Sequence, residues 1–155
     1  MANPVLRAAG PADAGVVGRL LRDFNDEFDT QGPEADAFGR RFHQLLNRPD
    51  VLVFLAESDT RPVGFAYLTL RPTPYYDGLL AQLEELYVRP DLRDQGIGTE
   101  LVLESIRVVQ ERGACEVHIN VDEVDVDTRR FYERHGFTNI QPGADYRMLC
   151  YLREL

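Results

Sequence analysis

One short segment, RPDLRDQGIGTELV at residues 89–102, constrains the fold of this chain more than any other part of the sequence. It joins the apolar run AQLEELYV, which predicts a strand, to apolar residues at helical spacing. Gly96 and Gly98 stand where the helix begins. A helix start carries unpaired N–H groups and a partial positive charge, and glycine leaves room for a bulky anion. The segment therefore predicts a phosphate or pyrophosphate site.

Three known kinds of glycine-containing phosphate loop can be compared with this segment. Arg93 adds a positive charge ahead of Gly96, and Thr99 adds a hydroxyl in the first helical turn. A dinucleotide-binding loop would need a third glycine where Leu101 stands, and a P-loop would need a lysine, which the chain lacks. What remains is Arg-x-x-Gly-x-Gly after a strand. Taken alone, these six residues fit an anion cradle and a merely tight strand–helix turn equally well.

Composition narrows the class of protein. The 155 residues are 44% hydrophobic and 28% charged, which fits one globular domain over residues 1–155. The net charge of −9 argues against nucleic acid as a partner, because such proteins carry a basic face. The N-terminus shows no secretory pattern and no run approaches the ~20 apolar residues of a membrane span. We therefore expect a cytoplasmic protein without a membrane partner.

The two cysteines, Cys115 and Cys150, follow no metal-ligand spacing. In a reducing cytosol we expect them to be free, buried thiols. No metal is expected.

The apolar periodicity predicts the order β-α-α-β-β-β-α-β-α-β-β, and hence a mixed sheet with helices on both faces. In the last predicted helix, Asp127 is the expected N-cap and Gly136 the glycine that follows the C-cap. A short strand is expected where VLRAAGPADAGVVGRLLRDF opens, and further strands at VLVFLAE, VGFAYLTL, AQLEELYV and CEVHINV and at the C-terminal DYRMLCYL.

Several of these segments together resemble the GCN5-related N-acetyltransferase (GNAT) superfamily. The glycine loop is similar to the family's acetyl-coenzyme A (acetyl-CoA) loop, LEELYVRPDLR resembles its fourth strand, and DVDTRRFYERHGF resembles its second signature. The opening VLRAAGPADA is similar to its first strand and turn. The family usually has Asn at the position of Asp125 and Ala at that of Thr128, which puts a hydrogen bond from that Asn to the cofactor in doubt.

The resemblance implies an α/β (α+β) fold, a single-domain GNAT fold. Its sheet would be mixed but mostly antiparallel, with six to seven strands, and splayed between strands 4 and 5. In the family, the thioester arm of acetyl-CoA lies along the end of the fourth strand, so Val88 N–H becomes the candidate donor to the developing oxyanion. The residues implied to hold the cofactor are Leu86, Tyr87, Val88, Arg93, Asp94, Gln95, Gly96, Ile97, Gly98, Thr99, Asp127 and Tyr132.

The resemblance also implies two catalytic residues. Tyr132 matches the family tyrosine that protonates the leaving thiolate, and a phenol with a reference pKa of about 10 stays protonated at neutral pH. Glu84 matches the proposed base of polyamine acetyltransferases. Glu84 and Glu85 are adjacent, so strand alternation predicts that they point to opposite faces. A core aromatic and a solvated strand glutamate are the structural alternatives for Tyr132 and Glu84.

The acceptor side in this superfamily is built from two loops, here FNDEFDTQG and RPTPYYDG. Their candidate substrate-binding residues are Phe28, Asp29, Tyr75 and Tyr76. Carboxylates interleaved with aromatics suit a cationic amine, although a solvated acidic loop is an equal alternative.

The sequence therefore predicts an acetyl-CoA-dependent N-acetyltransferase (an acyltransferase) that acts by direct transfer to a small-molecule amine in a ternary complex. The alternative is a non-catalytic acyl-CoA sensor or assembly module. Homodimers are common in the superfamily, but no stretch of this sequence specifies one.

Overall fold

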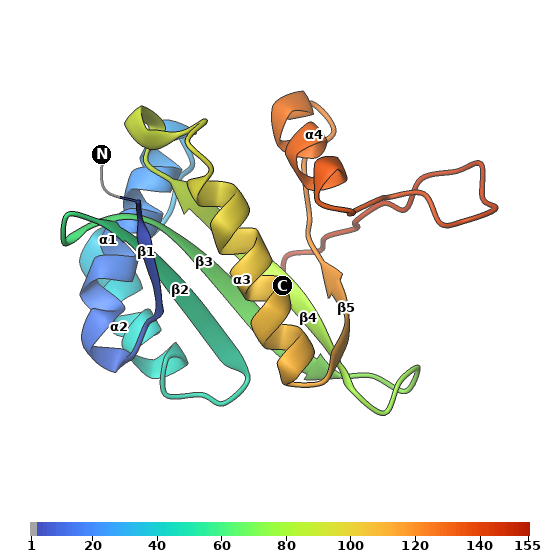
Figure 1. Cartoon of the computed structure of the whole chain (residues 1–155), viewed down its shortest axis with the longest axis horizontal. Helices are drawn as coiled ribbons and strands as arrows, with labels where there is room; N and C mark the ends of the chain where they lie inside the picture. Colours follow the sequence, from blue (N-terminus) through green and yellow to red (C-terminus); the bar gives the residue numbers. More distant parts are fainter. Residues whose placement is uncertain (1–2) are drawn as a thin grey trace. The chain divides into compact units, whose positions relative to one another are not determined.

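The computed structural model describes residues 3–155, which form two compact units, residues 3–118 and Ile119–Leu155. The first unit contains a five-stranded sheet and three α-helices, and the second contains one α-helix (Figure 1). In chain order the elements are β1 (Val5–Ala8), η1 (Pro11–Asp13), α1 (Ala14–Glu27), α2 (Ala35–Leu45), β2 (Val51–Ser58), β3 (Arg61–Pro72), β4 (Leu79–Val88), η2 (Pro90–Leu92), α3 (Ile97–Glu111), β5 (Ala114–His118) and α4 (Val126–Arg134).

The sheet of the first unit follows the order β1-β2-β3-β4-β5. The first four strands pair antiparallel with their neighbours, and β5 pairs parallel to β4 after the α3 crossover. Short connections join β2, β3 and β4, whereas α1 and α2 separate β1 from β2. Five described strands form, rather than the six or seven predicted, but the mixed, mostly antiparallel class is confirmed.

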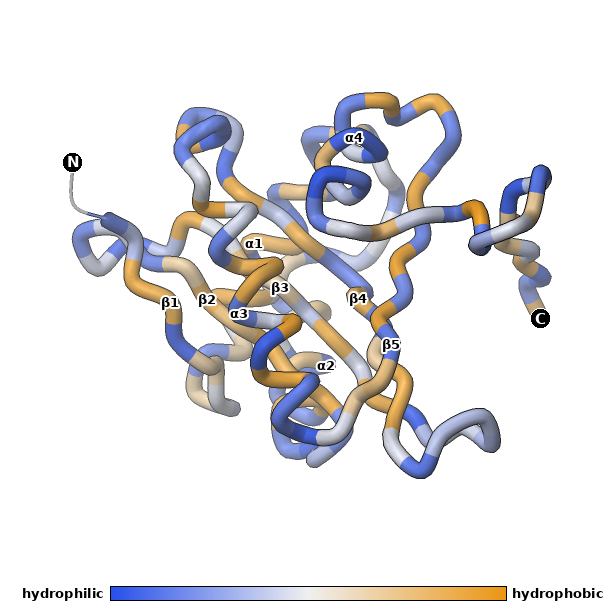
Figure 2. Tube along the Cα trace, turned by 45° about the vertical axis from the view of Figure 1, so that its right-hand side comes forward, coloured by the Kyte–Doolittle hydropathy of each residue, from blue (hydrophilic) through white to orange (hydrophobic). Residues whose placement is uncertain are grey.

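Helices cover both faces of this sheet, as predicted. Helices α1 and α2 pack on one face and α3 crosses the other (Figure 1). Strand β2 is apolar along most of its length because it lies between these layers (Figure 2). The core on the α1 and α2 side consists of Ala14, Val17, Leu20, Leu21, Phe38, Phe42, Val53, Leu55, Phe65 and Tyr87.

Helices α1 and α2 approach each other closely at two glycines. A Cβ on Gly18 would lie 2.6 Å from the Gly39 nitrogen and 2.8 Å from the Ala35 carbonyl oxygen, both backbone atoms that cannot move aside. Gly18→Ala should therefore destabilise the protein by about 1–3 kcal/mol through overpacking, measured by urea unfolding. Gly15→Ala on the same helix is the control, because its Cβ would meet only an arginine side chain at 3.7 Å. A variant at Gly18 as stable as that control would contradict the close approach.

The N-cap of helix α4 in the second unit lies two residues earlier than predicted. The N-cap is Asp125, whose carboxylate accepts the Thr128 N–H at 3.2 Å. Asp127 lies inside the first turn instead. The prediction of Asp127 as N-cap was wrong because either aspartate suits the position, and the turn at 122–125 decides which one adopts non-helical backbone angles.

The C-terminal end of α4 explains the Gly-Phe pair in the sequence. Gly136 has a φ of +87°, as predicted for the residue after the C-cap. The Phe137 N–H donates to the Tyr132 carbonyl and the Gly136 N–H to that of Glu133, which together form a Schellman motif. The Phe137 ring also packs edge-on against the Tyr132 ring at 5.4 Å. The motif therefore fixes the tyrosine from its C-terminal side.

Two further predictions were wrong. The C-terminal segment DYRMLCYL forms no strand. Cys115 and Cys150 are free, as predicted, but both are exposed. Cys115 lies on β5 at the edge of the sheet, and Cys150 lies in that unpaired C-terminal segment.

Candidate functional site

Strand β4 has an open edge over its second half. Its parallel pairing with β5 extends only from Leu79 to Gln82, whereas the strand continues to Val88. The Arg89 N–H donates to Val63 on β3 at 2.8 Å. Because successive N–H groups along a strand point to opposite edges, the Val88 N–H and, two residues earlier, the Leu86 N–H point to the open edge. The predicted separation of the fourth and fifth strands is therefore present.

The start of α3 lies in the loop that follows this strand end. Gly96 is the N-cap with a φ of +86°, a backbone conformation that glycine adopts without strain. No side chain caps the helix, and among residues 3–155 the N–H groups of Gly96, Ile97 and Gly98 donate to no protein acceptor. These unpaired donors at a positive helix end fit a diphosphate.

Arg93 connects the loop between β4 and the start of α3, here called the cradle loop (residues 89–98), to the end of β4 and to α1. Its Nε donates to the Val88 carbonyl at 2.9 Å, and its two terminal nitrogens donate to the Glu27 carboxylate at 2.6 and 2.7 Å. The hydrogen bonds that Arg93 donates to Glu27 raise the pKa of the arginine, and the guanidinium lies over the Tyr87 ring at 5.8 Å. Arg93, predicted to face phosphate, is thus also the group that satisfies the open-edge carbonyl of Val88.

A β-bulge in β4 corrects the predicted directions of the two adjacent glutamates. Glu85 pairs with Tyr67 and Leu83 pairs with Leu68, so Glu84 is an extra residue without a partner on β3. The Glu84 carboxylate accepts the Thr69 hydroxyl at 2.6 Å, and Thr69 lies on the same face as Tyr67. Both carboxylates therefore lie on the α1 and α2 face, because a bulge interrupts strand alternation.

The two glutamates differ in environment. Glu84 is exposed, whereas Glu85 is half-buried. Burial, and secondly the negative charge of Glu84, raise the pKa of Glu85 to about 7. Sequence patterns do not reveal this difference, because it depends on the bulge and on neighbours from other elements.

Aromatic rings line the same face beyond Glu85. Phe24 on α1 stacks on Tyr87 at 5.2 Å, and Phe28 packs against Phe24 at 5.4 Å while remaining 56% exposed. Phe28 and Asp29 follow directly on the Glu27 that binds Arg93. The first predicted acceptor loop therefore lies near the end of β4.

The second predicted acceptor loop lies at the other end of β4. Tyr75 is 84% exposed, and the Tyr76 hydroxyl donates to Glu116 on β5 at 2.7 Å. Since Glu116 is level with Leu80, which lies eight residues before Val88 on β4, this loop is roughly 27 Å from Val88. Within one chain the structure does not bring Tyr75 and Tyr76 together with Phe28 and Asp29.

Tyr132 belongs to the second unit, where it is 6% exposed between the rings of Phe131 and Phe137. The N-cap bond of Asp125 and the Schellman motif fix the helix at both ends. Residues of the signature itself therefore contribute to holding the tyrosine in place.

Residues 3–155 contain no group of three or more His, Cys, Asp or Glu side chains arranged to hold a metal ion. Over the same residues, no helix combines the length and apolar character required to cross a membrane.

Comparison with known proteins identifies the family that this fold and cradle define. The model of the acetyltransferase (GNAT) family matches residues 18–137, and the chain belongs to that family. The match includes β4, the cradle loop and α4, so all three predicted signatures lie inside it.

Individual relatives agree with this assignment. A crystal structure from Arthrobacter sp. FB24, classed as an acetyltransferase, is 46% identical with a TM-score of 0.90 and covers 97% of this chain and 96% of that one. An uncharacterised N-acetyltransferase of Methanocaldococcus jannaschii is 31% identical over 62% of this chain and 43% of its own length. An aminoglycoside N(6′)-acetyltransferase of Klebsiella aerogenes is 30% identical over 64% of this chain and 67% of its own. The chain thus spans less than half the length of the Methanocaldococcus jannaschii relative.

Proposed function

We propose that this chain is an acetyl-CoA-dependent N-acetyltransferase that acetylates a primary amine of a small, cationic acceptor by direct transfer in a ternary complex. The observation that carries the proposal is the open edge of β4 beside the unpaired N–H groups that begin α3. Membership of the GNAT family supports it. One domain over residues 1–155 and a cytoplasmic location remain predictions.

Acetyl-CoA, when bound, supplies the acetyl group as a thioester. The amides of Gly96, Ile97 and Gly98 are proposed to hold its diphosphate, and the Leu86 and Val88 N–H groups its acyl arm. The Val88 N–H then stabilises negative charge on the carbonyl oxygen as the amine attacks. Arg93 keeps the Val88 carbonyl satisfied, so that the strand end retains its geometry without a neighbouring strand.

Two groups are proposed to move protons. An alkylammonium must lose a proton before it attacks, and Glu85 is now favoured over Glu84 because its raised pKa lies near neutral pH. Glu85 lies three residues, about 10 Å, before Val88, so the proton reaches it through water. Tyr132 is proposed to protonate the leaving thiolate.

The acceptor site is proposed to lie on the α1 and α2 face of β4. Two carboxylates, Glu84 and Glu85, share this face with the rings of Phe24, Phe28 and Tyr87. A cationic amine would form ion pairs with the two carboxylates and cation–π contacts with the aromatic rings. The name of the Klebsiella aerogenes relative, an aminoglycoside acetyltransferase, is consistent with this class of acceptor.

The test is thiol release from acetyl-CoA with a panel of aminoglycosides, polyamines and amino-acid derivatives, alongside calorimetric titration with CoA. Saturable release with one amine is expected. Binding of CoA without release from any amine would favour the alternative, a non-catalytic acyl-CoA sensor. Absence of binding by folded protein would overturn both.

Tyr132→Phe should lower kcat by about 100-fold, the low end for general acid catalysis, because a thiolate is already a fair leaving group. The substitution keeps the ring that packs against Phe137, so the fold and the affinity for CoA should stay unchanged. Steady-state kinetics and calorimetry measure the two effects separately. An unchanged kcat would exclude the tyrosine from the acid role.

A further inference from the structure

Two arginines of the cradle loop reach α1 in the same way. Arg93 donates from both terminal nitrogens to the Glu27 carboxylate, and Arg89 donates from one terminal nitrogen to Asp23 at 3.1 Å. Each arginine also donates from Nε to a main-chain carbonyl, Arg93 to Val88 at 2.9 Å and Arg89 to a carbonyl of β3 at 3.1 Å. The two carboxylates are four residues apart on α1 and so share one face of that helix. Two matched contacts therefore hold α1 against the cradle loop and the strands beside it.

The pair of Glu27 and Arg93 is the more ordered of the two contacts. Both oxygens of Glu27 are occupied by Arg93, at 2.6 and 2.7 Å. A planar guanidinium that meets a carboxylate through two nitrogens is fixed in orientation as well as in position. Glu27 therefore determines where the Nε–H of Arg93 points, which is at the Val88 carbonyl. Since the Arg93 side chain is 38% exposed, such a pair adds little to folding stability, and orientation is its main effect.

The Val88 main chain is the part of the site that this orientation controls. Val88 is the last residue of β4, and its N–H and carbonyl both point to the open edge, because the two groups of one strand residue share a direction. The hydrogen bond from Arg93 fixes the main chain on the C-terminal side of Val88. That bond therefore limits how far the N–H of the same residue can turn.

We propose that Glu27 is a positioning residue for acetyl transfer: it orients Arg93, which holds the end of β4 so that the Val88 N–H faces the carbonyl oxygen of the thioester. The inference rests on the proposed function, because it concerns the same oxyanion donor. It assigns Arg93 to the geometry of the strand end rather than to the diphosphate. It also excludes Glu27 as the base or as the carboxylate that binds the amine, because both of its oxygens are already occupied.

Glu27→Gln should separate turnover from cofactor binding. Glutamine offers one acceptor oxygen and turns an NH2 group toward the guanidinium, so the two-nitrogen contact and the charge are lost. We expect kcat to fall about tenfold, less than the ~100-fold cost of losing an oxyanion donor outright, because the Val88 N–H is still present but is less well aimed. The Kd for CoA should not rise, since a guanidinium released from Glu27 can approach the diphosphate. General damage to the site would raise that Kd as well.

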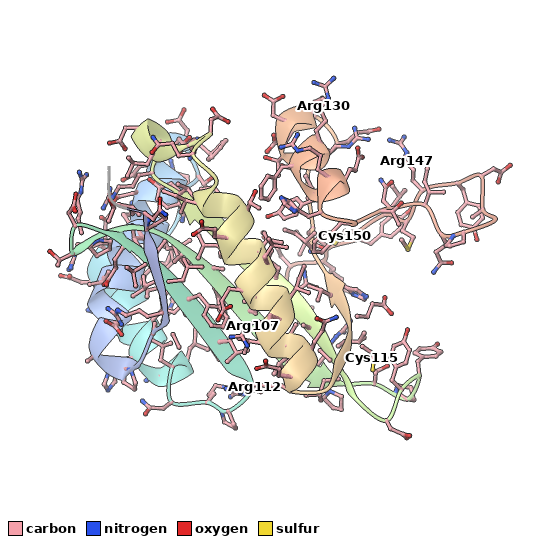
Figure 3. All side chains as sticks on the ribbon, in the orientation of Figure 1. Arg107, Arg112, Cys115, Arg130, Arg147 and Cys150 are labelled. Atoms are coloured by element: carbon pink, nitrogen blue, oxygen red, sulfur yellow. The ribbon has the colours of Figure 1, made fainter. Side chains whose placement is uncertain are left out.

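Glu104→Gln is the matched control for the loss of one charged pair. Glu104 accepts two hydrogen bonds from Arg107, at 2.8 and 2.7 Å, and both residues lie on α3. Arg107 is ten residues, about 15 Å, beyond the start of that helix (Figure 3). The change removes the same kind of contact but leaves the strand end untouched, so kcat and the Kd for CoA should equal those of the parent.

Nitrogen-15 NMR tests the contact in the absence of any substrate. The Nε–H of Arg93 should give a resonance that is protected from exchange with water, because it is hydrogen-bonded and the guanidinium is held by Glu27. Arg93→Lys assigns this resonance by removing it. Folded Glu27→Gln should lose the protection, whereas Glu104→Gln should change only the signal of Arg107. An unprotected Arg93 Nε–H in the parent would overturn the proposal, even where the parent acetylates an amine.

Kinetics of a double variant test whether the two residues act as one unit. The kcat of the variant with both Glu27→Gln and Arg93→Lys should be no lower than that of Arg93→Lys alone. A loss equal to the product of the two single losses would contradict the proposal. If the parent releases no thiol with any amine, the proposed function fails and the positioning role fails with it. If the parent is active and folded Glu27→Gln keeps the parent kcat, the positioning role alone is wrong.

Discussion

Replacement of Gly98 by valine is expected to raise the Kd for CoA by at least about 100-fold. Gly98 is the second residue of α3, and its N–H belongs to the set that has no protein acceptor. A branched side chain there would hold a diphosphate away from these amides. Losing roughly two hydrogen bonds to charged oxygens costs about 3 kcal/mol or more, which corresponds to that loss of affinity.

Calorimetric titration of the variant with CoA measures this effect. Gly10→Val is a matched control, because Gly10 has extended backbone angles and nothing within 4 Å of an added Cβ. The control should bind CoA as the parent does. If Gly98→Val is folded and binds CoA with undiminished affinity, the diphosphate does not lie at the start of α3.

Glu85→Gln is expected to lower kcat by about 100-fold or more, the range typical of general base catalysis. Only the carboxylate form accepts a proton, and its pKa is raised to about 7. The parent rate should therefore fall about tenfold per pH unit below 7 and level off above it. In the glutamine variant this acidic limb should disappear, because the amide does not titrate.

Glu84→Gln provides the comparison on the same strand. Glu84 is exposed and accepts a hydrogen bond from Thr69, which a glutamine oxygen can also accept. Its kcat at saturating amine should stay within a few-fold of the parent, and its pH profile should keep an acidic limb that moves to lower pH, because the negative charge of Glu84 no longer raises the pKa of Glu85. The opposite result, with the rate and the limb lost in Glu84→Gln alone, would return the base role to Glu84.

Local signals in the sequence were sufficient for most of the fold. Gly96 and Gly136 were predicted at helix ends, and both have positive φ angles there. The helices on both faces of the sheet were expected from the order of the elements, and the separation of β4 from β5 was implied by the resemblance to the GNAT superfamily. These features depend on residues close together in the chain, which is why a pattern of spacing and glycine reveals them.

The tertiary structure alone decided the features that join distant parts of the chain. Arg93 binds Glu27, 66 residues away, and the bulge that turns Glu84 and Glu85 to one face exists only in the pairing of β4 with β3. The raised pKa of Glu85 follows from that burial. The same limit applies to the C-terminal DYRMLCYL, which has the pattern of a strand but forms none, because a strand also requires hydrogen-bonded pairing with a neighbouring strand. Spacing encodes a residue's conformation, whereas its charge state and partners depend on what folding brings next to it.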